Sequence, residues 1–227
     1  MNDDLESPFN ALPSVVVALA VVIGGVELMF VLATAGLLGG DGGVGWRIAA
    51  LRDFAVLDDV WHWMVANNTW PWSELRRFMT YPFLHTASLE AVFVIVFILA
   101  MGKVVGEVFH PLAFLAIFWA SSSVGALSFV VFLNEPFALA GGFPGVYGLI
   151  GAFTFLLWAD LGVRGGNKMR AFALVATLLA IQLLFSLVSG NFGGVVSELG
   201  GFVAGFFLSF LVSPGGWQRV LAKLRDR

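Results

Sequence analysis

Three glutamates interrupt long apolar stretches of this sequence and are the first candidates for chemistry. They are Glu27, Glu90 and Glu198. An ionisable side chain among apolar residues costs free energy unless it finds a partner, so it is by default a candidate functional group. Carboxyl groups in such surroundings can hold or relay a proton, or bind a cation. A metal site would need more ligands than these acids and a nearby histidine supply, and we predict no metal and no cofactor.

A serine nucleophile is the second kind of chemistry to consider, because the chain has no cysteine. A serine hydroxyl needs a base within hydrogen-bonding reach. Of the three histidines, His62 and His110 belong to connections between apolar segments, so only His85 could approach a serine, Ser197. Serines within helices also bond to backbone carbonyls, and we favour this interpretation. It covers Ser121, Ser122, Ser123, Ser186 and Ser197. For His85 we favour a polar group at a helix start.

The composition indicates a membrane protein. Of the 227 residues, 59% are hydrophobic and 12% are charged, whereas an ordinary soluble domain carries roughly 25% charged residues. With a mean hydropathy of +0.91, the chain has too little polar surface to cover a soluble globule. The small net charge of −3 gives no support for nucleic acid as a partner.

Six segments are long and apolar enough to cross a bilayer, which takes about 20 residues of helix. They are residues 13–38, 79–101, 111–133, 144–161, 169–188 and 195–212. We therefore predict an all-α membrane protein, a polytopic six-helix bundle over residues 13–213. An N-terminal tail, 1–12, precedes it and a basic tail, 214–227, follows it. The fourth and sixth segments are short and glycine-rich, which predicts that they pack inside the bundle.

The one long connection, residues 39–80, has the composition of a layer at the membrane surface. It holds five of the eight tryptophans together with four arginines and five acids. Tryptophan flanked by charge is typical of the headgroup level. We predict one or two short amphipathic helices that lie on the membrane. The tryptophans are Trp46, Trp61, Trp63, Trp70 and Trp72.

The distribution of basic residues predicts the orientation. With six spans, both termini and the 2–3 and 4–5 connections share one side of the membrane, which carries eight Lys and Arg residues. The other side carries only four, all in the long connection. The positive-inside rule then places both termini in the cytoplasm, and we expect a bacterial inner membrane. The eight are Lys103, Arg164, Lys168, Arg170, Arg219, Lys223, Arg225 and Arg227.

Small residues recur at a spacing of four, which lets two helix backbones approach closely. These residues are Ser121 and Gly125, Gly141 and Gly145, and Gly201 and Gly205, with Gly148 and Gly151 following in the second stretch. Taken alone, they predict close helix packing and no chemistry.

In context, these stretches resemble the rhomboid intramembrane proteases. Residues 142–152, Gly-Phe-Pro-Gly-Val-Tyr-Gly-Leu-Ile-Gly-Ala, look like that family's fourth-helix motif, in which Gly-x-Ser-Gly begins a short helix. Residues 197–205, Ser-Glu-Leu-Gly-Gly-Phe-Val-Ala-Gly, are similar to its sixth-helix motif, Ala-His-Leu-Gly-Gly with a further Gly four residues later. Residues 78–85 resemble the start of its second span, and Trp46-Arg47 fits its membrane-embedded first loop. The resemblance covers about residues 45–213 and implies the rhomboid six-helix fold.

The same resemblance implies that the catalytic residues of the family are replaced. Rhomboid hydrolysis uses a serine whose proton passes to a histidine. Pro144 stands at the serine position, where proline also suits the first turn of a helix, and Glu198 stands at the histidine position. Counting from His85, the two oxyanion positions fall on Glu90 and Val94. An ionised carboxylate donates no hydrogen bond and valine offers none, which predicts a catalytically dead pseudoprotease.

The resemblance also places the second-helix and sixth-helix motifs around one cavity. Glu90 and Glu198 are then expected to face each other, with His85 and Ser197 beside them. Two close carboxyl groups cannot both ionise cheaply, which favours a structural pair that shares a proton or is bridged by water. Relict acids in a wet vestibule, and a metal or proton-relay role, are the alternatives. Glu27 has no partner that the sequence identifies.

Three functions follow from these observations. The first is a non-catalytic rhomboid-like protein, surrounded by membrane lipids, that binds transmembrane helices of other membrane proteins. It would act as an assembly or quality-control factor, or as an accessory subunit of a membrane complex. The resemblance implies a lateral opening beside the second and fifth helices. The second is an active intramembrane serine protease with an unrecognised site. The third is a small proton or cation transporter that uses Glu27, Glu90 and Glu198.

Overall fold

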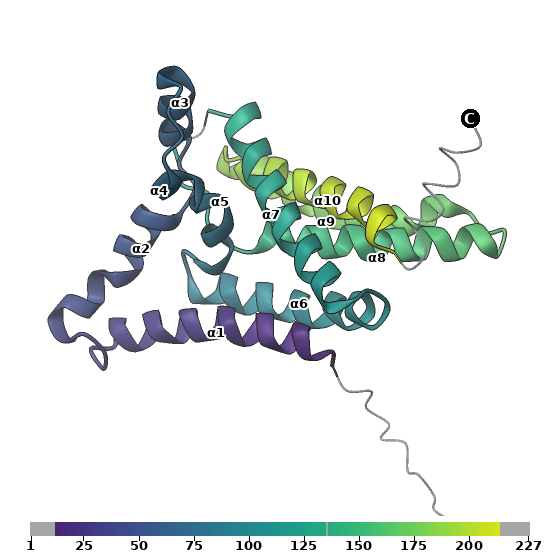
Figure 1. Cartoon of the computed structure of the whole chain (residues 1–227), viewed down its shortest axis with the longest axis horizontal. Helices are drawn as coiled ribbons and strands as arrows, with labels where there is room; N and C mark the ends of the chain where they lie inside the picture. The colour runs from purple at the N-terminus through teal and green to yellow at the C-terminus, as the bar shows by residue number, and fades with distance from the viewer. Residues whose placement is uncertain (1–11, 135, 214–227) are drawn as a thin grey trace, which may run out of the picture.

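The prediction of an all-α, six-helix membrane bundle is confirmed by the structure, a computed structural model that describes residues 12–134 and 136–213 (Figure 1). The six helices long and apolar enough to span a membrane are α1 (Ser14–Thr34), α6 (Ser88–Val108), α7 (Pro111–Phe132), α8 (Phe143–Val163), α9 (Ala173–Ser189) and α10 (Gly193–Val212). The short helix η3 (Lys168–Phe172) leads directly into α9. Apart from Leu12, the predicted tails, 1–12 and 214–227, lie outside the described residues.

Two expectations about the spans were wrong. The second span begins at Ser88 rather than at residue 79, because Pro82 lies in the short helix η2 (Tyr81–Phe83) and the chain then turns extended at Leu84. The fourth and sixth spans are not short, since α8 has 21 residues and α10 has 20. Both extend past the apolar windows, as their flanking glycine and phenylalanine residues continue the helix.

The long connection is more helical than predicted. After η1 (Gly40–Gly45) come two helices of two to three turns, α2 (Trp46–Phe54) and α3 (Asp58–Asn67), and then two single turns, α4 (Trp72–Leu75) and α5 (Arg77–Thr80). Figure 1 shows these elements at one end of the bundle, with α3 projecting beyond α7. Several of their large apolar side chains are exposed, among them Ile48 and Trp72. This arrangement fits a segment that lies at the membrane surface.

Backbone hydrogen bonds fasten this connection to the bundle. Val56 and Leu139 exchange two of them, with N–O distances of 3.0 and 2.8 Å. The buried hydroxyl of Tyr81 donates to the carbonyl of Ser122 on α7 at 2.6 Å. The guanidinium of Arg77 donates to two carbonyls at the end of α2. The connection is therefore held in one position relative to the membrane helices.

Glycines let α8 and α10 pack backbone to backbone. A Cβ atom on Gly205 would overlap the carbonyl of Gly148, and one on Gly201 would overlap the carbonyl of Pro144. Likewise, a Cβ on Gly151 would collide with the backbone of α10. Only glycine permits such an approach, which maximises van der Waals contact between helices that gain no hydrophobic drive from lipid.

The other spans surround this contact unequally. In Figure 1, α1 and α6 lie side by side, and α7 crosses obliquely over the bundle. Half of the α7 and α8 spans is buried, whereas the span formed by η3 and α9 is 17% buried, the smallest share of the six. Helix α9 therefore lies at the periphery, beside α8 and α10.

The glycine contact yields a first prediction. Gly205→Ala should lower the free energy of unfolding by roughly 1–3 kcal/mol, because the added methyl group meets a backbone carbonyl that cannot move aside. Gly25→Ala is the matched control, since a Cβ there meets nothing within 4 Å. Unfolding in mixed micelles measures both, and equal stability of the two variants would contradict the packing described.

Candidate functional site

The positions singled out by the sequence gather where α8 begins. A Cβ atom on Gly141 would lie 2.5 Å from Oε1 of Glu90, and one on Gly142 would lie 2.8 Å from Cγ1 of Val94. These contacts bring the outer half of α6 against the start of α8. Gly141 lies before the helix with φ of 100°, so it serves the turn rather than a helix interface with Gly145.

Pro144 and the start of α10 meet at the same place. A Cβ atom on Gly125 of α7 would lie 2.6 Å from Cβ of Pro144 and 2.5 Å from the carbonyl oxygen of Ser197. Pro144 is buried in the first turn of α8, where its missing N–H costs nothing. Ser121 faces Gly148 one turn further along, so α7 completes a three-helix junction with α8 and α10.

His85 holds the turn before α8. It lies between η2 and α6, is 1% exposed, and its Nε2 accepts the backbone N–H of Gly142 at 3.3 Å. The imidazole proton is thereby assigned to Nδ1, which is buried without a hydrogen-bond partner. Burial lowers the pKa of His85 to about 4, with the guanidinium of Arg47 acting in the same direction and Glu27 opposing it. The residue is a neutral structural acceptor at ordinary pH.

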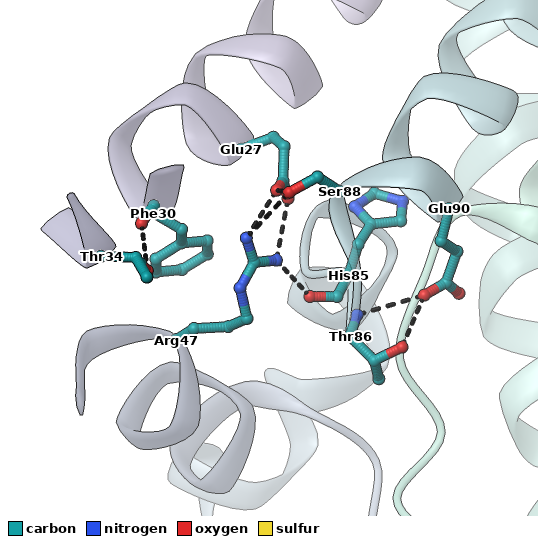
Figure 2. A network of polar contacts seen from close by, with 8 residues as sticks. All are labelled: Glu27, Phe30, Thr34, Arg47, His85, Thr86, Ser88 and Glu90. Atoms are coloured by element: carbon teal, nitrogen blue, oxygen red, sulfur yellow. Dashed lines mark hydrogen bonds and ion pairs between the residues drawn. The ribbon is translucent and has the colours of Figure 1, made fainter. Parts of the chain in front are cut away.

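Glu90 closes the first turn of α6. Its Oε2 accepts the backbone N–H of Thr86 at 3.1 Å and the Thr86 hydroxyl at 2.8 Å (Figure 2). These bonds pair the two donors of Thr86, two residues before the helix begins, and so fix the turn that leads into α6. These local hydrogen bonds give Glu90 a structural role at the start of α6, and no catalytic role is needed to explain its position.

Glu27 has a full set of partners (Figure 2). Arg47 of α2 donates to both of its carboxylate oxygens, at 2.5 and 3.0 Å, and Ser88 donates to it at 2.6 Å. The same guanidinium donates to the carbonyl of His85 at 2.8 Å and lies 5.2 Å from the centre of the Phe30 ring. This bidentate clamp ties α1, α2 and the start of α6 together. Sequence reasoning missed it, although Trp46-Arg47 had been noted as a motif.

Glu198 differs from the other two glutamates. It is 3% exposed, and its Oε1 accepts the side-chain amide of Gln182 on α9 at 2.7 Å. Its Oε2 is buried and makes no hydrogen bond of ordinary length, although the hydroxyl of Tyr147 is close enough to act as a donor to this carboxyl group. The neighbouring Ser197 donates its hydroxyl to the carbonyl of Gly194 at 2.9 Å. Gln182, a lone amide in an apolar span, was the signal that sequence reasoning overlooked.

The expected pairing of Glu90 with Glu198 is found only in part. The two carboxyl groups are close enough to repel each other electrostatically. They share no direct hydrogen bond: one oxygen of Glu90 accepts from Thr86, one oxygen of Glu198 accepts from Gln182, and the second oxygen of Glu198 bonds to neither. A proton shared directly between them is therefore wrong for this arrangement. Each acid has its own local donor instead.

A small cavity lies beside Glu198, between α6, α8 and α9. Its volume is about 120 Å³, and its wall is apolar except for Tyr147 and Gln182. The other lining residues are Phe97, Phe143, Val146, Ile150, Leu178 and Ile181. Within the described residues, no three His, Cys, Asp or Glu side chains come together as a metal site. The arrangement offers hydrogen-bond acceptors in an apolar pocket.

The comparison with protein families agrees with this geometry. The family model described as Rhomboid domain matches residues 72–215, which is well over half of the chain and includes the spans from α6 to α10. No curated protein matches the chain significantly.

The clamp yields a second prediction. Arg47→Met should lower the free energy of unfolding by about 2–4 kcal/mol, because it leaves the carboxylate of Glu27 poorly solvated and short of donors. The double variant that adds Glu27→Leu should recover part of the loss. As a control, Arg164→Met breaks an exposed ion pair with Asp160 and should cost no more than about 0.5 kcal/mol. Similar losses in the two single variants would contradict the clamp.

His85 yields a third prediction, on pH. Its folded-state pKa of about 4 lies below the ordinary 6.5, so the unfolded chain binds more protons between these values. The free energy of unfolding should therefore be unaffected by His85 protonation above pH 6.5 and should fall by up to about 3 kcal/mol as pH decreases towards 4. Unfolding measured across this range should show the decline in the wild type and in His62→Gln. A decline that persists unchanged in His85→Gln would refute the assignment.

Proposed function

The chain belongs to the rhomboid family, and from that premise we propose that it is a non-catalytic member that binds transmembrane helices of other membrane proteins. It would serve as an assembly or quality-control factor, or as an accessory subunit of a membrane complex. The observation that carries the proposal is the pairing of Pro144 and Glu198 at the junction of α8 and α10, where resemblance to the family calls for a nucleophile and a base.

The hydrogen bonds around this junction support the absence of hydrolysis. Pro144 has no nucleophilic atom, and the adjacent hydroxyl of Ser197 is directed to the backbone of its own helix. The imidazole of His85 uses Nε2 to accept a backbone N–H, so it is not placed to take a proton from serine. Glu90 and Val94 supply no donor for an oxyanion. Binding without cleavage is the function that these groups allow.

The periphery of the bundle supports a helix-binding role. Helix α9 buries little of its surface, and a cavity separates it from α6 and α8. Its large side chains on the outer face, such as Leu184, Phe185 and Val188, are exposed within the membrane span. Because α9 buries little surface, displacing it would cost less packing than displacing another span, which would open the bundle to a helix from the bilayer.

The orientation that we propose has both termini in the cytoplasm of a bacterial inner membrane. The start of α1 lies against the end of α6, because a Cβ on Gly106 would lie 3.1 Å from Pro13. Lys103 is in the same region of α6, and Arg164 and Lys168 flank the α8–η3 turn. The positive-inside rule supports placing this basic end in the cytoplasm.

A photo-crosslinking residue at Ile181 tests the proposal. This side chain lines the cavity and is half exposed to the membrane. We expect light-dependent adducts with other integral membrane proteins from position 181 and few from Val22 on α1, which is exposed at a similar depth. The captured partners should have their full-length mass, and a fluorophosphonate probe should label no serine. A labelled serine or a cleaved partner would establish a protease, and equal adducts from both positions would indicate random collision.

A further inference from the structure

One oxygen of Glu198 lacks a donor in a place where donors are scarce. Both oxygens of Glu27 accept hydrogen bonds, whereas Oε2 of Glu198 is buried without one of ordinary length and has only the more distant hydroxyl of Tyr147 near it. A buried acceptor without a donor costs free energy, and the lipid-filled surroundings of a membrane helix offer little water to replace it. This group is therefore ready to accept a donor from outside the chain.

The cavity borders the two side chains that interact with Glu198. Its two polar residues, Tyr147 and Gln182, are also the two side chains that interact with Glu198. The volume of about 120 Å³ is comparable with the roughly 150 Å³ that holds a benzene molecule, so it admits a side chain but not a helix. A side chain that enters between α6 and α9 would meet Tyr147 and Gln182, the two neighbours of the Glu198 carboxyl group.

Gln182 already shows the kind of donor that the carboxyl group takes. Its amide supplies the hydrogen bond to Oε1 and links peripheral α9 to α10. A side chain from another helix could add a second donor at Oε2, or replace Gln182 when α9 moves. A basic side chain would bind most strongly, because a charge-assisted hydrogen bond is roughly twice as strong as a neutral one.

We infer that Glu198 binds a lysine or arginine side chain from a partner transmembrane helix that packs between α6 and α9. The inference rests on the proposed function and names the chemistry of the partner. Glu198 lies five residues after the start of α10, which is about 8 Å along the helix. The partner's basic residue should therefore lie within about two turns of the same membrane face. A basic residue at that depth is costly when alone, so its pairing gives selectivity over purely apolar helices.

Model helices test this inference with the full-length protein in liposomes. The probes are Leu/Ala peptides of about 21 residues with lysine at the matching depth, methionine at the same position, or lysine at the centre. Energy transfer between labelled protein and labelled peptide measures association. We expect the lysine peptide of matching depth to bind roughly three- to thirtyfold more tightly than the methionine peptide.

Two variants then assign the effect to Glu198. Glu198→Leu should remove the preference for lysine while leaving the weaker binding of the methionine peptide in place. Gln182→Leu removes the internal donor, so the preference should increase. Asp160→Asn, at an exposed acid of the opposite membrane face, is the control and should behave as the wild type.

The outcomes separate the two claims. Binding of no peptide would count against the proposed function itself. Equal binding of the lysine and methionine peptides would overturn this inference and leave helix binding intact. A preference that survives Glu198→Leu, or that ignores the depth of the lysine, would also overturn it. Should Glu198→Leu fail to fold, the direction of change in Gln182→Leu decides.

Discussion

Helices α8 and α10 meet backbone to backbone, and this contact sets the position of Pro144 relative to Ser197 and Glu198. Gly205 lies against the carbonyl of Gly148, and Gly201 lies against the carbonyl of Pro144. The two helices therefore have little freedom to slide past each other. The contact places Pro144 beside the first turns of α10, whichever side chains those turns carry. Because the frame is made of backbone and glycine, other side chains at the junction can vary while the fold stays intact.

The bilayer imposes a second condition, since polar groups in the spans must find partners within the protein. Glu27 meets it with a guanidinium and a hydroxyl, and Glu90 with the Thr86 backbone and hydroxyl. For Glu198, only Oε1 accepts a hydrogen bond of ordinary length, from the amide of Gln182. The three acids look alike in the sequence, but Glu27 ties three helices together, Glu90 bonds locally to Thr86, and Glu198 is linked to α9 through one oxygen only. That difference is why the binding chemistry is assigned to Glu198.

The two sides of the bundle differ in how firmly they are held. On one side, the long connection is fixed by the Arg47 clamp, by the Val56–Leu139 bridge and by Tyr81. On the other side, α9 is largely exposed and borders a cavity. This difference in burial supports the proposal that a partner helix would pack beside α9.

The sequence by itself determined the membrane class, the number of spans and the family. Long apolar runs match the thickness of the bilayer, and glycines at a spacing of four permit close helix packing, so both patterns are visible in short stretches of sequence. It also supplied Pro144 and Glu198, the two residues on which the proposal of a non-catalytic member rests. Helix starts were less predictable, as the proline that delays α6 acts through local geometry. Only the tertiary structure decided the partners of the acids. Arg47 lies 20 residues from Glu27 and Gln182 lies 16 from Glu198, and hydrogen bonds across such separations depend on how helices face one another, which no local pattern encodes.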